Sequence, residues 1–257
     1  MNFSEDLSLA LRLADAADAI SLARFRALDL NIETKPDRSP VTDADRAVEL
    51  ALKGILAAER PDDGIVGEEF GNSGSTTRKW IIDPIDGTAN YMRGVPVWAS
   101  LIALSIDGHA VVSVVSAPAL GKRWWAAPGI AKTSEIDGTI RDLKVSNIED
   151  LEHASLSYNN LQLWDQYGFL EQLISLSRKV WRTRAYGDFY SYMLLAEGSV
   201  DIVAEHDLKL YDIAALVPIV EQSGGTFTAF DGPLTEGSSS VLVTNGKLHD
   251  TVMSNLT

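Results

Sequence analysis

The sequence predicts an α/β protein with an α+β N-terminal half and an α/β C-terminal half. The first observation is length: at 257 residues, single hydrophobic cores begin to divide. The second observation is the order of helical and strand patterns along the chain. Residues 1–145 contain helical patterns followed by strand patterns, whereas strands and helices alternate in residues 146–257. We therefore predict two fused subdomains, 1–145 and 146–257, although no Gly- or Pro-rich linker separates them.

Two helices are predicted at the start of the N-terminal half. Residues 4–28 carry apolar side chains at helical spacing along an otherwise polar segment. A second helix is expected over residues 43–59, because Thr42 and Asp45 form a capping-box pattern at its start and Pro61 follows its end.

Strands are predicted after these helices. A short strand over residues 64–70 includes two glutamates, and the Trp-Ile-Ile run at 80–82 indicates a buried strand. An antiparallel meander should follow, because Asp107-Gly108 is a strong hairpin signal between apolar runs. Its strands are expected at residues 97–106, 109–117 and 122–128.

The C-terminal half alternates between the two kinds of element. Strand patterns occupy residues 154–158, 179–185, 199–205, 225–230 and 240–245. Helical patterns lie at residues 166–178, from about 189 onward, and from 212 to a stop at Gly224-Gly225. This order is typical of α/β units.

Composition excludes several classes of function. The net charge of −14 opposes binding to nucleic acids or anionic membranes. The chain has no cysteine, so disulfides, thiolate metal sites and cysteine nucleophiles are excluded, and its four histidines show no metal-binding spacing. The N-terminus has no signal-peptide pattern, and no apolar run approaches the ~18 residues of a membrane span. We expect a cytoplasmic protein.

The segment "WIIDPIDGT" is the most informative stretch. Asp83 and Asp86 follow a buried run at residues 80–82, and two close carboxylates repel unless a cation lies between them. Gly87 and Thr88 come next, and at the start of a helix or tight turn their backbone N–H groups would suit phosphate oxygens. We interpret the segment as a metal-binding loop for phosphoryl transfer.

Further acidic residues lie at predicted element ends. Asp45 and Asp212 open helices, where the helix dipole alone favours an acidic residue, and Glu68 ends a strand. Taken singly, each therefore has a structural explanation. Taken together with the aspartate loop, they supply the oxygen ligands that Mg²⁺ prefers, and paired ions can stabilise both the attacking and the leaving oxygen.

Four motifs together resemble the inositol monophosphatase family of Mg²⁺-dependent phosphatases. They are "PVTDAD" at 40–45, "GEE" at 67–69, "WIIDPIDGT" at 80–88 and "YDIAALVPIVEQSGG" at 211–225. Their order and spacing match across nearly the whole chain. The resemblance implies the layered α-β-α-β-α sugar-phosphatase fold and a homodimer.

The same resemblance assigns roles to individual residues. Metal ligands, for two or three Mg²⁺ per active site, correspond to Glu68, Asp83, the Ile85 carbonyl, Asp86 and Asp212. The pair that orients the nucleophilic water corresponds to Asp45 and Thr88, with Glu68 also catalytic. The implied reaction is an in-line attack by a metal-activated water without a covalent intermediate.

Within the family, three segments most resemble the histidinol-phosphate phosphatases of histidine biosynthesis. They lie at residues 25–49, 94–108 and 180–205. This likeness implies histidinol phosphate as the small-molecule substrate, and its ammonium and imidazole would suit a wall that contains Asp188 and Glu205. Asn90 also falls at a substrate position. Arg184 either pairs with Asp188 or lies at the active-site rim, where we place it. Inositol 1-phosphate or another small polyol phosphate is the alternative substrate.

Two other functions remain in competition. Haloacid-dehalogenase-type phosphatases use an Asp-x-Asp-Gly-Thr loop, but two residues separate Asp83 from Asp86 here. A metal- or phosphate-binding regulator on an inactive phosphatase scaffold is the non-enzymatic alternative. The presence of every expected ligand argues against it.

Overall fold

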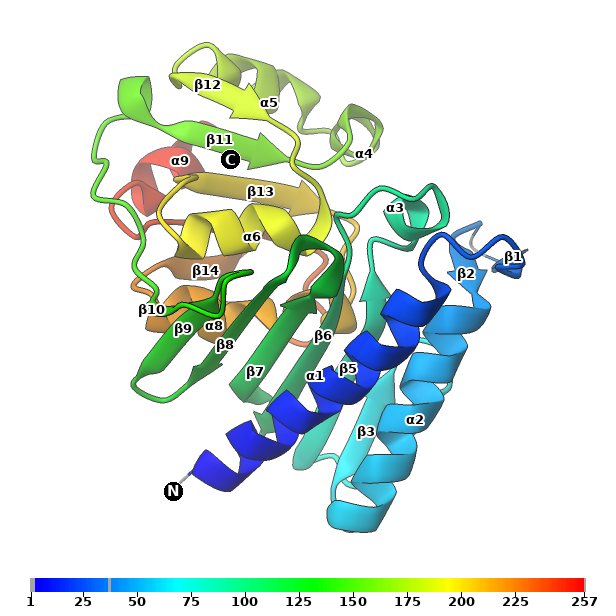
Figure 1. Cartoon of the computed structure of the whole chain (residues 1–257). Helices are drawn as coiled ribbons and strands as arrows, with labels where there is room; N and C mark the ends of the chain where they lie inside the picture. The colour runs from blue at the N-terminus through cyan, green and yellow to red at the C-terminus, as the bar shows by residue number, and fades with distance from the viewer. Residues whose placement is uncertain (1–2, 37, 257) are drawn as a thin grey trace.

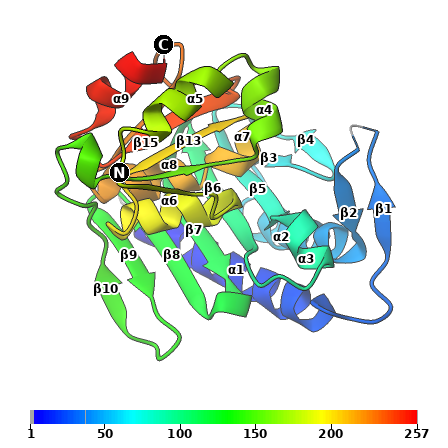
Figure 2. The same ribbon diagram turned by 90° about the horizontal axis from the view of Figure 1, so that it is seen from above.

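Two large β-sheets, a small two-stranded sheet and three layers of helices organise the chain in the computed structural model, which describes residues 3–36 and 38–256 (Figure 1). Helices α1 and α2 cover one face of an eight-stranded sheet, and α6 and α8 lie between that sheet and a five-stranded sheet. Helices α4, α5 and α9 cover the outer face of the smaller sheet, as Figure 2 shows from above. This α-β-α-β-α succession confirms the predicted fold class.

The N-terminal elements build the larger sheet and its outer helices. They are α1 (Ser4–Arg24), β1 (Ile32–Thr34), β2 (Pro40–Thr42), α2 (Asp43–Glu59), β3 (Gly64–Gly67), β4 (Gly71–Ser73), β5 (Arg78–Asp86), α3 (Thr88–Met92), β6 (Ala99–Ile106), β7 (His109–Ala117), a 3₁₀ turn (Pro118–Leu120), β8 (Lys122–Ala127), β9 (Ile130–Ser134) and β10 (Ile140–Asp142).

The C-terminal elements build the smaller sheet and the remaining helices. They are a 3₁₀ turn (Leu151–His153), β11 (Ser155–Tyr158), α4 (Leu161–Gln166), α5 (Leu170–Ser177), β12 (Arg182–Arg184), α6 (Asp188–Ala196), β13 (Ile202–His206), α7 (Leu210–Ile213), α8 (Leu216–Gln222), β14 (Thr226–Ala229), β15 (Ser240–Thr244) and α9 (His249–Leu256).

The eight-stranded sheet has the order β10-β9-β8-β7-β6-β5-β3-β4 and is antiparallel except between β3 and β5. The predicted meander of β6, β7 and β8 is confirmed, and its first turn contains Asp107 and Gly108, both at positive φ. The five-stranded sheet has the order β12-β11-β13-β15-β14, with parallel pairs on both sides of β11.

Side chains alternate between the two faces of strand β13, so this strand packs against helices on both sides of its sheet. Val203 of β13 faces the core cluster that contains α6 and α8, whereas Ile202 and Ala204 face the cluster formed with α4, α5 and α9. The largest core cluster includes residues from both sides of position 145. The division into subdomains 1–145 and 146–257 remains a prediction.

Several predicted boundaries were wrong. Helix α1 ends at Arg24 rather than near 28, because Phe25 turns into an extended conformation and packs against Tyr91 and Trp98. The helix predicted over residues 166–178 corresponds to α5 and begins only at Leu170, because Gly168, at φ +81°, lies between it and the preceding helix α4. Helix α4 was not predicted. Strands β9 and β10 and helix α9 were not predicted. None of the helices described here is both long and apolar enough for a membrane span.

Candidate active site

The end of β5 carries the two central aspartates. On a regular strand, Asp83 and Asp86 would point to opposite faces, because side chains alternate with a period of two. The pairing of β5 with β6 is irregular between these two residues, where Pro84 lacks the N–H group that a sheet ladder needs. Asp83 is buried, and its Oδ1 accepts a hydrogen bond from the Ile85 N–H at 3.0 Å.

Helix α7 adds a third carboxylate. Asp83, Asp86 and Asp212 each offer an oxygen, and these oxygens lie within 4.8 Å of one another. Asp212 also caps its helix, because its Oδ2 accepts from the Lys209 N–H at 2.6 Å. Asp212 therefore stabilises the start of its helix and also belongs to the carboxylate cluster. A cluster of hard oxygen donors of this kind is suited to Mg²⁺.

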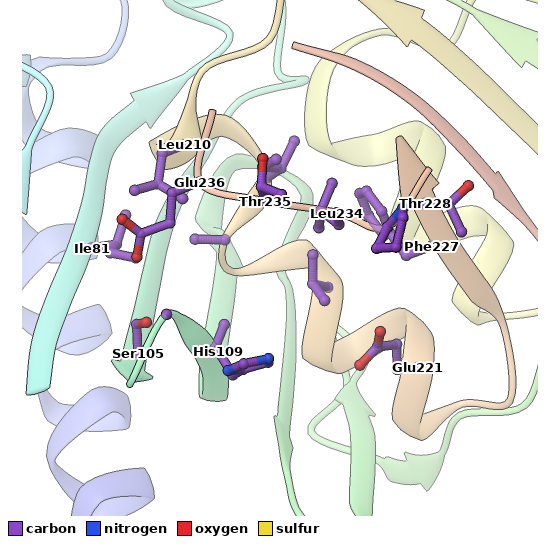
Figure 3. Close-up of a pocket in the computed structure, with 16 residues that line it drawn as sticks. Ile81, Ser105, His109, Leu210, Glu221, Phe227, Thr228, Leu234, Thr235 and Glu236 are labelled. Carbon is purple, nitrogen blue, oxygen red and sulfur yellow. The ribbon is translucent and has the colours of Figure 1, made fainter. Parts of the chain in front are cut away.

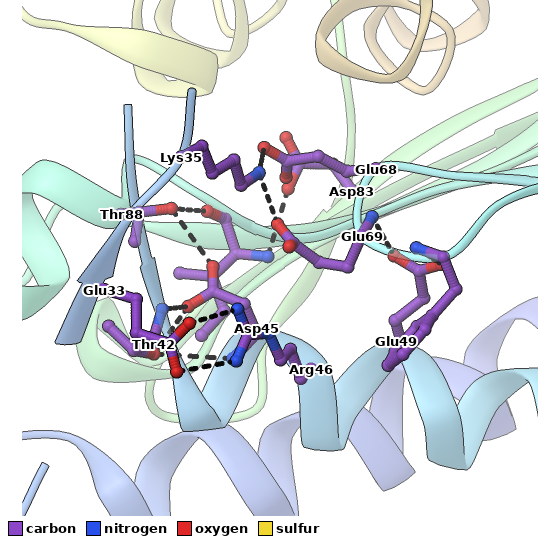
Figure 4. A network of polar contacts seen from close by, with 12 residues as sticks. Glu33, Lys35, Thr42, Asp45, Arg46, Glu49, Glu68, Glu69, Asp83 and Thr88 are labelled. Atoms are coloured by element: carbon purple, nitrogen blue, oxygen red, sulfur yellow. Dashed lines mark hydrogen bonds and ion pairs between the residues drawn. The ribbon is translucent and has the colours of Figure 1, made fainter. Parts of the chain in front are cut away.

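The loop after β3 brings glutamates to the same place (Figure 4). Glu68 Oε1 pairs with the Lys35 ammonium at 2.7 Å, and Lys35 also pairs with Glu69 at 2.5 Å. Buried Glu49 holds the loop by accepting the N–H groups of Glu69 at 2.7 Å and Phe70 at 3.1 Å. Glu68 Oε2 is buried and has no hydrogen-bond partner within the described part of the chain.

The start of α2 positions Asp45. The predicted capping box is present: Asp45 Oδ2 accepts from the Thr42 N–H at 2.8 Å and from its hydroxyl at 2.5 Å. The other oxygen, Oδ1, accepts from the Thr88 hydroxyl at 3.1 Å, which also lies 2.9 Å from the Ile85 carbonyl (Figure 4). The water-orienting pair predicted from the family resemblance is therefore in direct contact.

Gly87 and Thr88 form the first turn after β5. Gly87 has φ +83°, and an added Cβ would lie 3.0 Å from the Val97 carbonyl oxygen and 3.2 Å from Asp188 Oδ2. Helix α3 begins at Thr88, where first-turn N–H groups have no partner inside the helix. The Asn90 amide donates to Val97 O and to Asp188 Oδ2, both at 2.9 Å.

Helix α6 and strand β13, both in the C-terminal half of the chain, form the other side of the site. The Phe189 N–H at the start of α6 donates to Asp86 Oδ2 at 2.7 Å, so the two halves of the chain meet at this aspartate. Figure 1 shows that β5 ends close to α3. A pocket of about 250 Å³ opens beside Asp86 and Asp212, and Asp188, Asn159 and Glu205 also line it.

Burial raises the pKa values of these acids above their usual range. Burial, followed by repulsion from Glu68 and Asp86, raises the pKa of Asp83 well above its usual range. Burial raises the pKa of Asp212 to about 7 and that of Asp45 to about 6. In the 250 Å³ pocket, burial raises the pKa of Glu205 to about 8. Such a concentration of negative charge favours a bound cation.

Several residues in and around the site were missed by the sequence analysis. Lys35 and Glu49 lie far from their partners in sequence, and Asn159 precedes a helix without any motif. Arg184 was predicted at the rim. Its side chain is exposed, and its described hydrogen bond, at 2.7 Å, goes to the Thr183 carbonyl rather than to Asp188. Its role in substrate binding remains a prediction.

Comparisons with known proteins agree with this geometry. The model of the inositol monophosphatase family matches residues 3–257. A histidinol-phosphatase of Mycobacterium tuberculosis is 54% identical over 254 residues, covering 98% of each chain. A histidinol-phosphatase of Streptomyces coelicolor is 51% identical over 98% of this chain and 97% of its own. An inositol monophosphatase structure from Zymomonas mobilis superposes with a TM-score of 0.85 at 36% identity, covering 100% of this chain and 99% of that one. The chain therefore belongs to the inositol monophosphatase family and is a phosphoric monoester hydrolase.

Proposed function

We propose that the enzyme hydrolyses L-histidinol phosphate to L-histidinol and phosphate, with Mg²⁺ as its cofactor. The observation that carries the choice of substrate is a pair of buried acceptors in the 250 Å³ pocket. Glu205 Oε1 and Asn159 Oδ1 are buried, and neither has a hydrogen-bond donor among residues 3–36 and 38–256. A buried acceptor without a donor is costly, so this pocket suits a ligand that brings donors.

The orientation of both groups is fixed by their other atoms. The Asn159 amide nitrogen donates to the His206 carbonyl at 2.7 Å, and because a carbonyl only accepts, the amide oxygen must face the other way. Glu205 Oε2 accepts from the Tyr192 hydroxyl at 3.0 Å, which leaves Oε1 available. The ammonium and imidazole N–H groups of histidinol phosphate would satisfy both oxygens, and the relatives named histidinol-phosphatase support the same choice.

The carboxylate cluster fits a divalent metal. Enzymes of this family depend on a metal ion, and Asp83, Asp86 and Asp212 have carboxylate oxygens within 4.8 Å of one another. The partnerless Glu68 Oε2 offers a further ligand. We propose these four residues and the Ile85 carbonyl as the ligands of two or three Mg²⁺. When bound, the metal would activate water and stabilise the negative charge of the leaving oxygen.

Thr88 and Asp45 would then orient the nucleophile. The Thr88 hydroxyl directs its hydrogen to Asp45 Oδ1 or the Ile85 carbonyl, so its oxygen lone pairs are available to accept a hydrogen bond from water. Asp45 is held by Thr42, and its pKa of about 6 allows it to take up a proton through Thr88 near neutral pH.

The remaining residues would bind the substrate. We propose that the backbone N–H groups of Gly87 and Thr88 contact the phosphate, as first-turn N–H groups of a helix do elsewhere. Asn90 positions Asp188 through its 2.9 Å hydrogen bond, and Asp188 faces the cationic part of the substrate. A homodimer, which the family resemblance implies, completes the proposal and can be tested by sedimentation of the purified enzyme.

A phosphate-release assay tests the substrate. Histidinol phosphate should be preferred over inositol 1-phosphate, fructose 1,6-bisphosphate and glycerol phosphate. Glu205→Gln and Asn159→Ala should raise KM for histidinol phosphate about tenfold or more, since a charge-assisted contact contributes roughly 1.5–3 kcal/mol, while glycerol phosphate hydrolysis stays the same. Equal losses on both substrates would show that these residues support the metal site, and the histidinol assignment would fail.

A further inference from the structure

A second cavity lies on the opposite side of the metal-bearing elements, and we call it the rear pocket. Its volume is about 450 Å³, against about 250 Å³ for the substrate pocket, and the two share no lining residue. The rear pocket is enclosed by α7 and α8, by the β6–β7 hairpin and by the loop 230–239 (Figure 3). Pockets of this size take small organic molecules.

The walls of the rear pocket are mainly apolar. They include Leu210, Ile213, Val217, Phe227 and Leu234. In Figure 3, His109 and Glu221 lie along the lower side of the pocket, whereas Leu210 and Leu234 lie above them. A ligand therefore needs an apolar body that leaves water and a polar group that reaches that side.

The polar side of the rear pocket presents hydrogen-bond acceptors. His109 Nδ1 lies 3.0 Å from the Asp107 carbonyl, and because a carbonyl only accepts, Nδ1 carries the hydrogen. In the neutral ring, Nε2 is then an acceptor. The Glu221 carboxylate has no hydrogen bond or ion pair with any residue that the structure describes. His109 and Glu221 are both exposed and both line the rear pocket, so a ligand in this pocket can be reached by both side chains.

Charge at the rear pocket selects for a cation. Glu236 also lines it, but its carboxylate pairs with the buried Lys79 ammonium at 2.7 and 2.8 Å, so these two charges cancel. The same pair fastens the loop 230–239 to β5. Glu221 remains as the lining carboxylate that has no ion pair with any residue the structure describes. An ammonium group, which has three donors, matches a carboxylate next to an imidazole acceptor.

We propose that the rear pocket binds a small primary amine, with its apolar body between α8 and the loop 230–239 and its ammonium group at Glu221 and His109. The ligand would contact the two elements that carry the aspartates of the metal cluster. Ile81 precedes Asp83 by two residues on β5, and Ile213 directly follows Asp212 on α7. The rear pocket is thereby a separate ligand site next to the catalytic framework.

Binding of 2-phenylethylamine to the full chain at pH 8 tests this proposal by isothermal titration calorimetry. The matched probes are 2-phenylethanol, which keeps the ring without the charge, and 3-phenylpropanoate, which reverses the charge. The amine should bind about tenfold more tightly than the alcohol, and the carboxylate should not bind. Equal affinity for all three probes, or no binding of the amine, overturns the proposal.

Variants distinguish the rear pocket from the acidic substrate pocket, which also attracts amines. Glu221→Gln should weaken amine binding about tenfold, whereas Glu205→Gln in the substrate pocket should leave it unchanged. Leu234→Trp should block the rear pocket, with its folding checked by thermal melting. If that variant does not fold, Glu221→Gln and Glu205→Gln still test the proposal. Loss of binding in Glu205→Gln, or unchanged binding in Glu221→Gln, overturns the proposal.

Discussion

At the scale of single residues, Asp83 and Asp86 are unfavourable for the folded chain unless a cation is bound. Both carboxylates have a pKa well above its usual range because burial and neighbouring acids disfavour their charge. The same arrangement that destabilises the metal-free protein prepares the site for a metal. The two carboxylates therefore lower the stability of the metal-free fold, although the proposed metal binding needs both of them.

Asp83→Asn and Asp86→Asn should therefore separate activity from stability. We expect phosphatase activity to fall by more than about a hundredfold, because a proposed metal ligand is lost. The melting temperature in EDTA should rise, because one repelling charge has been removed. Asp231→Asn, an exposed aspartate, is the control and should change neither quantity. Near-normal turnover in either site variant would contradict the metal assignment.

The Thr88 side chain allows a finer test, because its hydroxyl is proposed to orient water, whereas only the backbone N–H of this residue is proposed to contact the phosphate. Thr88→Ala should lower kcat by about 10² or more while KM and Mg²⁺ affinity change little, since the contact matters mainly in the transition state. Thr88→Ser keeps the hydroxyl group and should retain most of the turnover. A raised KM with unchanged kcat in Thr88→Ala would instead assign this residue to substrate binding.

At the scale of elements, the N-terminal cap of helix α2 both stabilises the helix and holds Asp45, a proposed catalytic residue. The Thr42 side chain caps the helix and also fixes Asp45, which contacts Thr88 in turn. Local sequence was sufficient to predict this cap, because its partners lie within three residues of each other. The same holds for the Asp107-Gly108 turn, where backbone conformation is decided by the residues themselves.

Thr42→Ala should consequently have two effects. Loss of the cap should reduce the free energy of unfolding by about 1 kcal/mol, measured by urea denaturation. Turnover should also fall, because Asp45 Oδ2 loses its hydroxyl donor at 2.5 Å and the carboxylate gains freedom to turn away from Thr88. Thr42→Ser should restore both quantities. A loss of stability with unchanged kcat would show that the cap does not position Asp45.

Other features of the site depend on distant partners and could not be predicted from local patterns. Lys35 meets Glu68 across 33 residues, and Asn159 meets His206 across 47. Neither contact leaves a periodic or motif signal, because it exists only after β-strands from different segments are placed side by side. Likewise, the apolar pattern of residues 166–178 did not show that α4 ends at Gln166 and that a separate helix begins at Leu170.

At the scale of the whole molecule, the candidate active site lies where the two halves of the chain meet. Asp86 from β5 accepts the Phe189 N–H of α6, and Asp212 comes from α7 in the second half. A bound metal would therefore bridge segments far apart in the sequence. Its binding energy would add to the stability of the folded state, because the unfolded chain cannot assemble the same ligands.

This linkage predicts how the stabilisation by Mg²⁺ depends on pH. In the metal-free fold, the pKa of Asp212 is raised to about 7, and that of Asp83 is also raised, above an unfolded value of about 4. The stability contributed by their protonated forms is complete below about pH 4 and is lost as pH rises through the folded pKa values. Mg²⁺ needs the deprotonated carboxylates, so the gain in melting temperature on replacing EDTA with Mg²⁺ should be small at pH 5.5 and large at pH 8. Asp212→Asn should flatten this dependence. A gain that is equal at both pH values in the unmodified protein would show that these carboxylates do not bind the metal.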